Sequence, residues 1–284
     1  MKRVLATTTI LALSTGFAAA EITMTGDARM GIISDYGSSD VEFTSRARVT
    51  FNLSGESDSG FSFGASFRAD NAGSAASGEA GSVWIEGAFG KLSMGDVDHA
   101  DLAAVGHVSG VGLTGLDDQN ELWFDSESGN ITPHILYGYT SGAFSGYASY
   151  DTNDTYAFGA KYATDAYSVA AGYARDGSDG DRQLSLAGSA TFGAVTAKAR
   201  YMTWESDWFF DQYGYALSLD YVADALTVTG YYTTIEIDTV GTDEEVYGLG
   251  ATYDLGGGAS IVGGYVNDVR FDTSAWDLGL SFSF

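Results

Sequence analysis

The residues best suited to chemistry lie in one long acidic stretch, residues 97–130, which contains no lysine or arginine. Carboxylates gathered in this way attract cations by charge, and their oxygen atoms can also coordinate Ca²⁺. The acids assigned to a candidate site are Asp98, Asp101, Asp117, Asp118 and Glu121, and Asp125 and Glu127 follow them in the same stretch.

Apolar residues are interspersed among these acids, and burial of their side chains is favourable. They are Leu102, Val105, Val108, Val111, Leu113, Leu116, Leu122, Trp123 and Phe124. A disordered surface loop is one interpretation of the stretch. The apolar residues favour the other interpretation, a loop folded into an interior.

Basic residues of opposite charge recur in segments that read as strands. Side chains of a strand alternate between its two faces, and this parity points the basic residues inward. The inward set is Arg29, Arg46, Arg48 and Arg68, with Lys161, Lys198 and Arg200 later in the chain. Guanidinium groups facing carboxylates across water produce a transverse field. The alternative is that inward bases merely pair with inward acids.

Catalytic motifs are weak. The three histidines are His99 and His107, expected on the loop, and His134, expected on a wall. The sequence holds no Gly-x-Ser-x-Gly elbow and no His-Glu-x-x-His metal motif. We therefore predict that the chain is not an enzyme, and a barrel enzyme remains the least favoured alternative.

The elements that position these residues are strands. From Trp276 to Phe284 every even position is apolar, and Asp, Gly or Ser fills every odd one. The same alternation appears at residues 41–53, 61–69, 156–162, 167–173, 184–192, 195–203, 213–221, 247–253 and 261–265. No long segment has the three- and four-residue spacing of a helix, so we predict an all-β fold.

The connections predict the number of strands. Seven short turns are expected, at 56–60, 90–91, 141–143, 164–166, 193–194, 223–225 and 256–258, with eight longer acidic loops between them. Fifteen connections imply sixteen antiparallel strands, and a barrel of that size leaves an aqueous channel. A soluble β-solenoid or β-sandwich is the alternative. The expected architecture is a transmembrane barrel whose long third loop, residues 97–130, folds inward.

Both ends of the chain support this interpretation. Lys2 and Arg3 precede an uncharged stretch that ends in Ala18-Ala19-Ala20, the pattern of a cleaved secretory signal over residues 1–20. The barrel is then expected to comprise residues 21–284. The last strand must pair with residues 21–34 to close the ring.

Composition excludes several partners. The chain has no Cys, one Pro and 38 Gly. Its formal charge is −25, and loss of Lys2 and Arg3 makes it −25 − 2 = −27. Such a surface repels nucleic acid and argues against direct binding of anionic lipid heads, although divalent cations can bridge the two.

Several stretches resemble the sixteen-stranded general porins of alphaproteobacteria, a Gram-negative porin family. They are residues 26–31 (GDARMG), 43–49 (FTSRARV), 61–68 (FSFGASFR), 87–96 (GAFGKLSMGD) and 247–259 (YGLGATYDLGGGA). The likeness covers essentially the whole mature chain. Residues 119–130 depart from the pattern, and the Pro-Glu-Phe-Gly loop motif of the enterobacterial branch is absent.

The resemblance implies a homotrimer whose third loop places carboxylates opposite an arginine cluster. Arg46, Arg48 and Arg68 match the family's inward basic positions, and residues 115–118 resemble part of its acidic loop. No cofactor is required. The resemblance also supports Ca²⁺ at Asp96, Asp98, Asp101, Asp117 and Asp118.

The function expected is that of an outer-membrane general diffusion porin. It would pass small hydrophilic solutes and ions, with a weak cation preference that follows from the excess of acids. A substrate-specific outer-membrane channel is the alternative. The expected partners are outer-membrane lipid and lipopolysaccharide, and the barrel-assembly machinery during biogenesis, which recognises the terminal aromatic.

Overall fold

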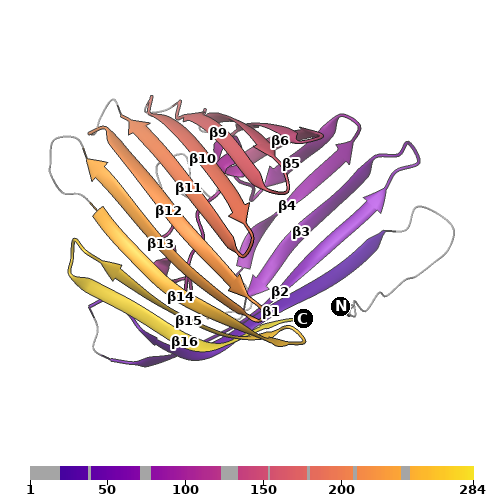
Figure 1. The fold of residues 1–284 in the computed structure, drawn as a ribbon. Coiled ribbons are helices and arrows are strands. Elements are labelled where there is room, and N and C mark those ends of the chain that lie inside the picture. Colours follow the sequence, from indigo (N-terminus) through magenta and orange to yellow (C-terminus); the bar gives the residue numbers. More distant parts are fainter. Residues whose placement is uncertain are drawn as a thin grey trace.

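The computed structural model describes residues 20–37, 40–70, 78–122, 134–152, 154–177, 180–206, 210–237 and 244–284. Their strands form one closed antiparallel barrel (Figure 1). The predicted signal segment falls almost wholly outside these residues, as do Asp125 and Glu127.

Sixteen strands are present in the described residues, as predicted. The first eight are β1 (Glu21–Ser34), β2 (Glu42–Glu56), β3 (Ser62–Asp70), β4 (Gly78–Gly87), β5 (Gly90–Gly95), β6 (His134–Ser141), β7 (Phe144–Tyr150) and β8 (Tyr156–Ala163). The other eight are β9 (Tyr167–Arg175), β10 (Arg182–Phe192), β11 (Val195–Glu205), β12 (Gln212–Ala223), β13 (Leu226–Ile237), β14 (Glu244–Gly256), β15 (Ala259–Asp268) and β16 (Thr273–Ser283).

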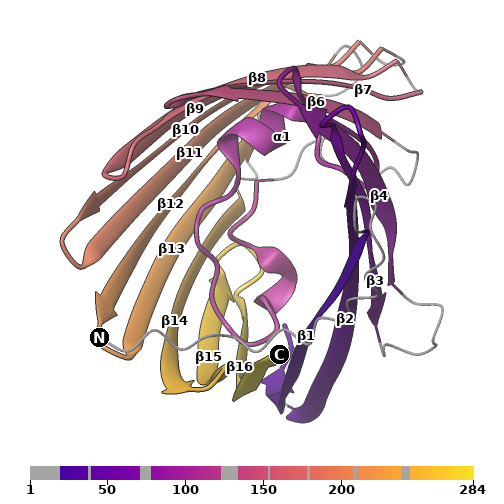
Figure 2. The same cartoon turned by 90° about the vertical axis from the view of Figure 1, so that its right-hand side faces the viewer.

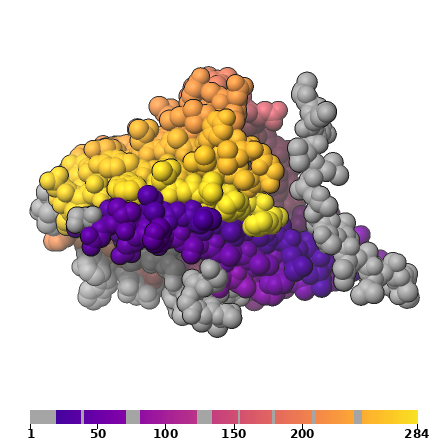
Figure 3. Space-filling view, turned by 90° about the horizontal axis from the view of Figure 1, so that it is seen from below, coloured from indigo at the N-terminus to yellow at the C-terminus, as the bar shows by residue number. Residues whose placement is uncertain are grey.

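Each strand pairs with its neighbours in sequence, and the first pairs with the last. In that seam, β1 and β16 run antiparallel from Asp27 opposite Ser283 to Ser34 opposite Trp276. Phe284 extends the seam by two backbone hydrogen bonds with Gly26. The two strands lie side by side in Figure 3, in indigo and yellow. The predicted closure is therefore confirmed.

Alternation assigns one side of each strand to the outside. Phe43 is 95% exposed and Leu219 is 59% exposed, and they belong to a band of exposed Tyr, Phe, Leu and Val side chains on successive strands. Exposure of so large an apolar area to water would be unfavourable. Such a band is therefore typical of a barrel surface that contacts lipid. The polar residues of the same strands face the interior.

The seven turns at one end are short, and lie at residues 57–61, 88–89, 142–143, 164–166, 193–194, 224–225 and 257–258. Their bounds agree with the predicted ones to within one residue except at one turn, because Gly90 and Lys91 belong to β5. The cross-strand pair of Gly87 with Gly90 closes a two-residue hairpin, so the turn lies two residues earlier than predicted.

The third long connection enters the barrel instead of continuing the wall. We call its described part, residues 97–122, the inner loop. β5 ends at Gly95, whose φ of +117° is a conformation that favours glycine. The inner loop contains the helix α1 (Ala100–Val105) and the 3₁₀ turn η1 (Leu116–Asp118). Figure 2 shows both inside the ring of strands. Neither of these helices is long enough to cross a membrane.

The buried core lies between the inner loop and the wall. Val108 and Leu122 of the loop pack with Met202, Trp204 and Ala216 of β11 and β12. Val111 and Leu116 form a second cluster with residues of β13 to β16, namely Tyr231, Val246, Val266 and Ala275. Of the apolar residues named in the acidic stretch, Val108, Val111, Leu113, Leu116 and Leu122 are buried as expected, and Leu102 and Val105 are half-buried. Trp123 and Phe124 lie outside the described residues.

Candidate pore constriction

Small residues on the wall let α1 approach it closely. The helix contacts β7, β8, β9 and β10. A Cβ added at Gly159 of β8 would collide with the carbonyl oxygen of Ala100 and lie 2.6 Å from the Cβ of Ala104. A Cβ at Gly172 of β9 would lie 2.6 Å from the Cβ of Asp101. These two glycines therefore define the contact surface of the helix.

Polar contacts fix the start of the loop on the same wall. The Ala100 N–H donates to the Ser149 hydroxyl at 2.9 Å, and the Gln183 amide donates to the Asp101 carboxylate at 2.7 Å. Asp101 is fully buried, and burial raises the pKa of its carboxyl. Asp101 thus joins the loop to β10 and is not exposed to the lumen, although the sequence placed it among the pore-lining acids.

Three polar side chains, Arg200 of β11 and His107 and Glu121 of the inner loop, contact one another in series. Nη1 of Arg200 is 2.7 Å from Nδ1 of His107, and Nε2 of His107 is 3.7 Å from a carboxylate oxygen of Glu121. Because arginine can only donate, Nδ1 of His107 is the acceptor. Burial and the charge of Arg200 lower the pKa of His107 to about 4, so the ring is neutral at pH 7. Arg200 is only 2% exposed, and this places it under the loop and not on the open wall.

Glu121 has the most unusual acid–base behaviour among the predicted site residues. Burial and the neighbouring Asp118 raise the pKa of its carboxyl to about 7, while Arg200 acts in the opposite direction. Its charge therefore changes within the physiological pH range.

The tip of the loop is held by a residue that sequence reasoning did not select. Asp277 of β16 is 3% exposed and accepts hydrogen bonds from the Leu113 N–H (2.8 Å), the Thr114 N–H (2.6 Å) and the Thr114 hydroxyl (2.7 Å). From β1, Arg29 donates to the Leu113 carbonyl at 3.1 Å. One signal could have revealed this role: Asp277 is the only charged residue in the inward set of the last strand.

The other predicted arginines lie together on β2 and β3. Arg46 pairs with Asp27 at 3.0 Å, and Arg48 and Arg68 share Asp70 at 3.1 and 2.8 Å. The side chains of the three arginines are 22–25% exposed, so they still face water. With Arg29 they form a cluster of four arginines, to which Asp27, Asp70 and, beside Arg29, Asp277 supply carboxylates. The guanidinium groups of this cluster are therefore paired with carboxylates and still in contact with water.

Lys161 and Lys198 also face the interior. With Ser168 and Ser189 they line a recess of about 200 Å³ that His107 and Arg200 border. Their inward direction agrees with the parity of their strands.

The exposed acids of the inner loop are Asp98, Asp117 and Asp118. Asp117 and Asp118 lie on η1 with φ of 60° and 50°, a left-handed conformation that aspartate tolerates better than most residues. Although both side chains reach water, the surrounding protein partly desolvates Asp98 and Asp117. This desolvation, and next the nearby carboxylates, raise the pKa of both carboxyl groups. Residues 97–122 contain no lysine or arginine, so this edge of the lumen is negative.

The five carboxylates considered for Ca²⁺ do not form one site. Asp101 is buried against β10, whereas Asp117 and Asp118 lie on η1, which contacts β15 and β16. Across the ranges that the structure describes, no three carboxylates gather in the way a metal ion requires. Calcium binding therefore stays a prediction.

A closed barrel of sixteen strands with a polar interior and an inward loop defines a water-filled channel. Comparison with known proteins agrees. A sequence model of Gram-negative porins matches residues 6–274. The porin of Rhodobacter capsulatus is 40% identical to this chain, and the match covers 93% of this chain and all of that protein. The chain belongs to the Gram-negative porin family.

Solved structures show the same fold. A porin structure that is 36% identical superposes with a TM-score of 0.82 and covers 93% of this chain and all of that chain. A variant of Rh. blastica porin, 21% identical and with the same coverage, has a TM-score of 0.75 and supports the fold alone. The protein is thus a general diffusion channel of the bacterial outer membrane, a passive pore and not an enzyme.

Proposed function

We propose that the pore selects by charge at a constriction with one acidic and one basic side, and that it weakly prefers cations. The observation that carries the proposal is the separation of charge. The inner loop holds exposed carboxylates and no lysine or arginine, while four arginines gather on β1 to β3, where the side chains of Arg46, Arg48 and Arg68 are 22–25% exposed.

The mechanism follows from this field. Water and polar solutes orient in a field between carboxylates and guanidinium groups, whereas an apolar solute must displace oriented water and gains nothing in return. Small hydrophilic solutes therefore pass most easily. The net excess of acids over the whole chain raises the local concentration of cations.

Neutralising the exposed acids of η1 tests the proposal. A unit charge about 10 Å away in water contributes about 0.4 kcal/mol, or roughly a twofold change in local ion concentration. The double substitution Asp117→Asn/Asp118→Asn should therefore lower the cation-to-anion permeability ratio by roughly twofold to fourfold. The measurement is the reversal potential of single channels in a salt gradient.

Asp224→Asn is a matched control, because Asp224 lies in a short turn at the end of the barrel. It should leave the reversal potential unchanged. Anion preference in the unsubstituted channel, or equal potentials for all three proteins, would refute the proposed selectivity.

A substrate-specific channel receives less support from the described residues. A sugar-binding aromatic track needs exposed aromatic faces in the lumen. Trp204 is 7% exposed beneath the inner loop, and the Lys91 ammonium lies 4.8 Å from the ring centre of Trp84. Competition of sugars with ion current tests this alternative, and block by one sugar class would favour it.

We further propose the form in which the channel works. Residues 1–20 are removed as a secretory signal, residues 21–284 assemble as a homotrimer among lipid and lipopolysaccharide, and the barrel-assembly machinery inserts the chain. The mass of the protein from outer membranes tests the first proposal, and three-step channel closure in planar bilayers tests the second.

A further inference from the structure

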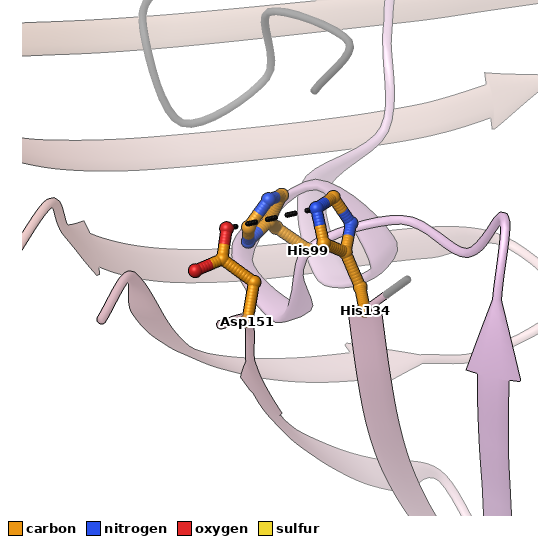
Figure 4. A group of neighbouring side chains, drawn as sticks. All are labelled: His99, His134 and Asp151. Atoms are coloured by element: carbon orange, nitrogen blue, oxygen red, sulfur yellow. Dashed lines mark ion pairs between the residues drawn. The ribbon is translucent and has the colours of Figure 1, made fainter. Parts of the chain in front are cut away.

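Three potential metal ligands gather where the inner loop leaves the wall. They are His99, which directly precedes α1, His134, which begins β6, and Asp151, which follows β7. One ligand atom from each lies within 4.8 Å of the others, and the residues are 7%, 7% and 3% exposed. Figure 4 shows the two rings and the carboxylate directed toward one another. No other group of this kind occurs in the described ranges.

The hydrogen bonds of His134 leave a lone pair directed at this point. Nδ1 of His134 is 3.2 Å from the carbonyl oxygen of Val97, which can only accept, so Nδ1 carries the proton. In the neutral ring, Nε2 then bears a lone pair. Nε2 is buried without a hydrogen-bond partner and lies 3.6 Å from Oδ2 of Asp151. A cation between this lone pair and the carboxylate oxygen would be bound favourably, because both groups are electron donors and the site is buried.

The two other residues complete the arrangement. Nδ1 of His99 is also buried without a hydrogen-bond partner, and the two imidazole rings lie 4.2 Å apart between their centres. Oδ1 of Asp151 accepts the Thr155 N–H at 3.0 Å, which fixes the carboxylate. Histidines held by backbone carbonyls and carboxylates held by amides are the usual surroundings of metal ligands.

We propose that His99, His134 and Asp151 bind a divalent transition metal of the Zn²⁺ class. Two imidazoles and one carboxylate suit Zn²⁺, Ni²⁺ or Cu²⁺ and not the all-oxygen preference of Ca²⁺ or Mg²⁺. Tetrahedral zinc with bonds of about 2.0–2.2 Å places its ligand atoms about 3.3 Å apart. The group closes by a small movement of side chains, and water completes the coordination.

The position gives the metal a structural effect. It would join the start of the inner loop to β6 and to the connection between β7 and β8. The loop that narrows the pore would thus be fixed to the wall at its base, in addition to the contacts of α1.

Titration calorimetry of the untagged full chain in detergent tests the proposal, with ZnCl₂ added after treatment with a chelator. We expect about one Zn²⁺ per chain. His99→Ala and Asp151→Asn should each weaken binding by at least about tenfold. The chain has three histidines, so His107→Ala is a matched control and should bind Zn²⁺ as the unsubstituted chain does.

His134→Asn keeps the proposal testable if His134→Ala does not fold. The asparagine amide can still donate to the Val97 carbonyl, while Nε2 is lost, so this variant should fold and fail to bind. Retention of binding in His99→Ala and His134→Asn, or absence of binding in the unsubstituted chain, would overturn the proposal. Equal binding of CaCl₂ that depends on the same residues would overturn the assignment to a transition metal.

Discussion

At the scale of single residues, burial determines which charged groups act on the lumen. The five acids predicted to line the pore in the acidic stretch differ in their exposure. Asp117 and Asp118 are exposed, Asp101 is fully buried, and Glu121 lies between these extremes. Strand parity predicted that Arg29, Arg46, Arg48 and Arg68 share one face with Arg200, but it could not reveal that the inner loop covers Arg200. That difference depends on contacts between residues about ninety positions apart, such as Arg200 with His107.

Glu121 should make the ion selectivity depend on pH. Because the pKa of its carboxyl is raised to about 7, the group is mostly neutral at lower pH and gains its negative charge as the pH rises through that value. Cation preference should therefore increase by roughly twofold between about pH 5.5 and about pH 8.5. Reversal potentials recorded at the two pH values measure this change.

In the Glu121→Gln variant this change should disappear, because the amide does not titrate. Glu205→Gln is a suitable control, since Glu205 ends β11 and its side chain is 62% exposed. A pH response that is equal in all three proteins would show that another group is responsible.

At the scale of elements, periodicity predicted the strands well and the docking of the loop only in outline. Strand positions follow from local alternation, so residues 41–53 are predicted as a strand without knowledge of the neighbouring strands. The inner loop lacks such a rule. Its apolar residues indicated burial, yet its particular contacts with the wall, such as Asp277 with Leu113, depend on three-dimensional closure.

Enlarging the contact surface of α1 should move the inner loop into the lumen. In Gly159→Ala, the new methyl group meets the Ala100 carbonyl and the Ala104 side chain, and overpacking of this kind costs about 1–3 kcal/mol. The helix then shifts away from the wall. We expect lower single-channel conductance and greater current noise in planar bilayers.

Gly146→Ala is the matched control on the neighbouring strand β7, because a Cβ there has no heavy atom within 4 Å. Its conductance should equal that of the unsubstituted channel. If Gly159→Ala conducts as Gly146→Ala does, α1 does not rest on this part of the wall in the membrane.

At the scale of the whole molecule, the ring closes through the last residues of the chain. Phe284 exchanges two backbone hydrogen bonds with Gly26, while its side chain is 80% exposed. The backbone of Phe284 therefore lengthens the pairing of β1 with β16, whereas its aromatic ring contributes little to packing within the barrel.

Removal of Phe284 should impair assembly before it affects conductance. Phe284→Ala separates the two roles, since it keeps the backbone pairs and removes only the ring. If assembly requires the aromatic ring, both the deletion and Phe284→Ala should lower the yield of folded protein in outer membranes, measured by heat-modifiable migration on gels. The few channels that form should conduct normally. A normal yield from both variants would contradict a role for the terminal aromatic residue in assembly.

The hydrogen bonds between the barrel wall and Leu113 have a consequence for the permeability of the outer membrane. Arg29 and Asp277 come from the two strands of the seam, and both hold this one residue of the inner loop. The inner loop thus connects the first strand to the last from inside the barrel. Opening of the seam would separate Arg29 from Asp277 and release the tip of the inner loop, whereas α1 and the cluster of Val108 and Leu122 would still hold the rest of the loop to the wall. We therefore expect a barrel with an open seam to leak more than a closed one, because the tip of the loop is no longer fixed across the lumen.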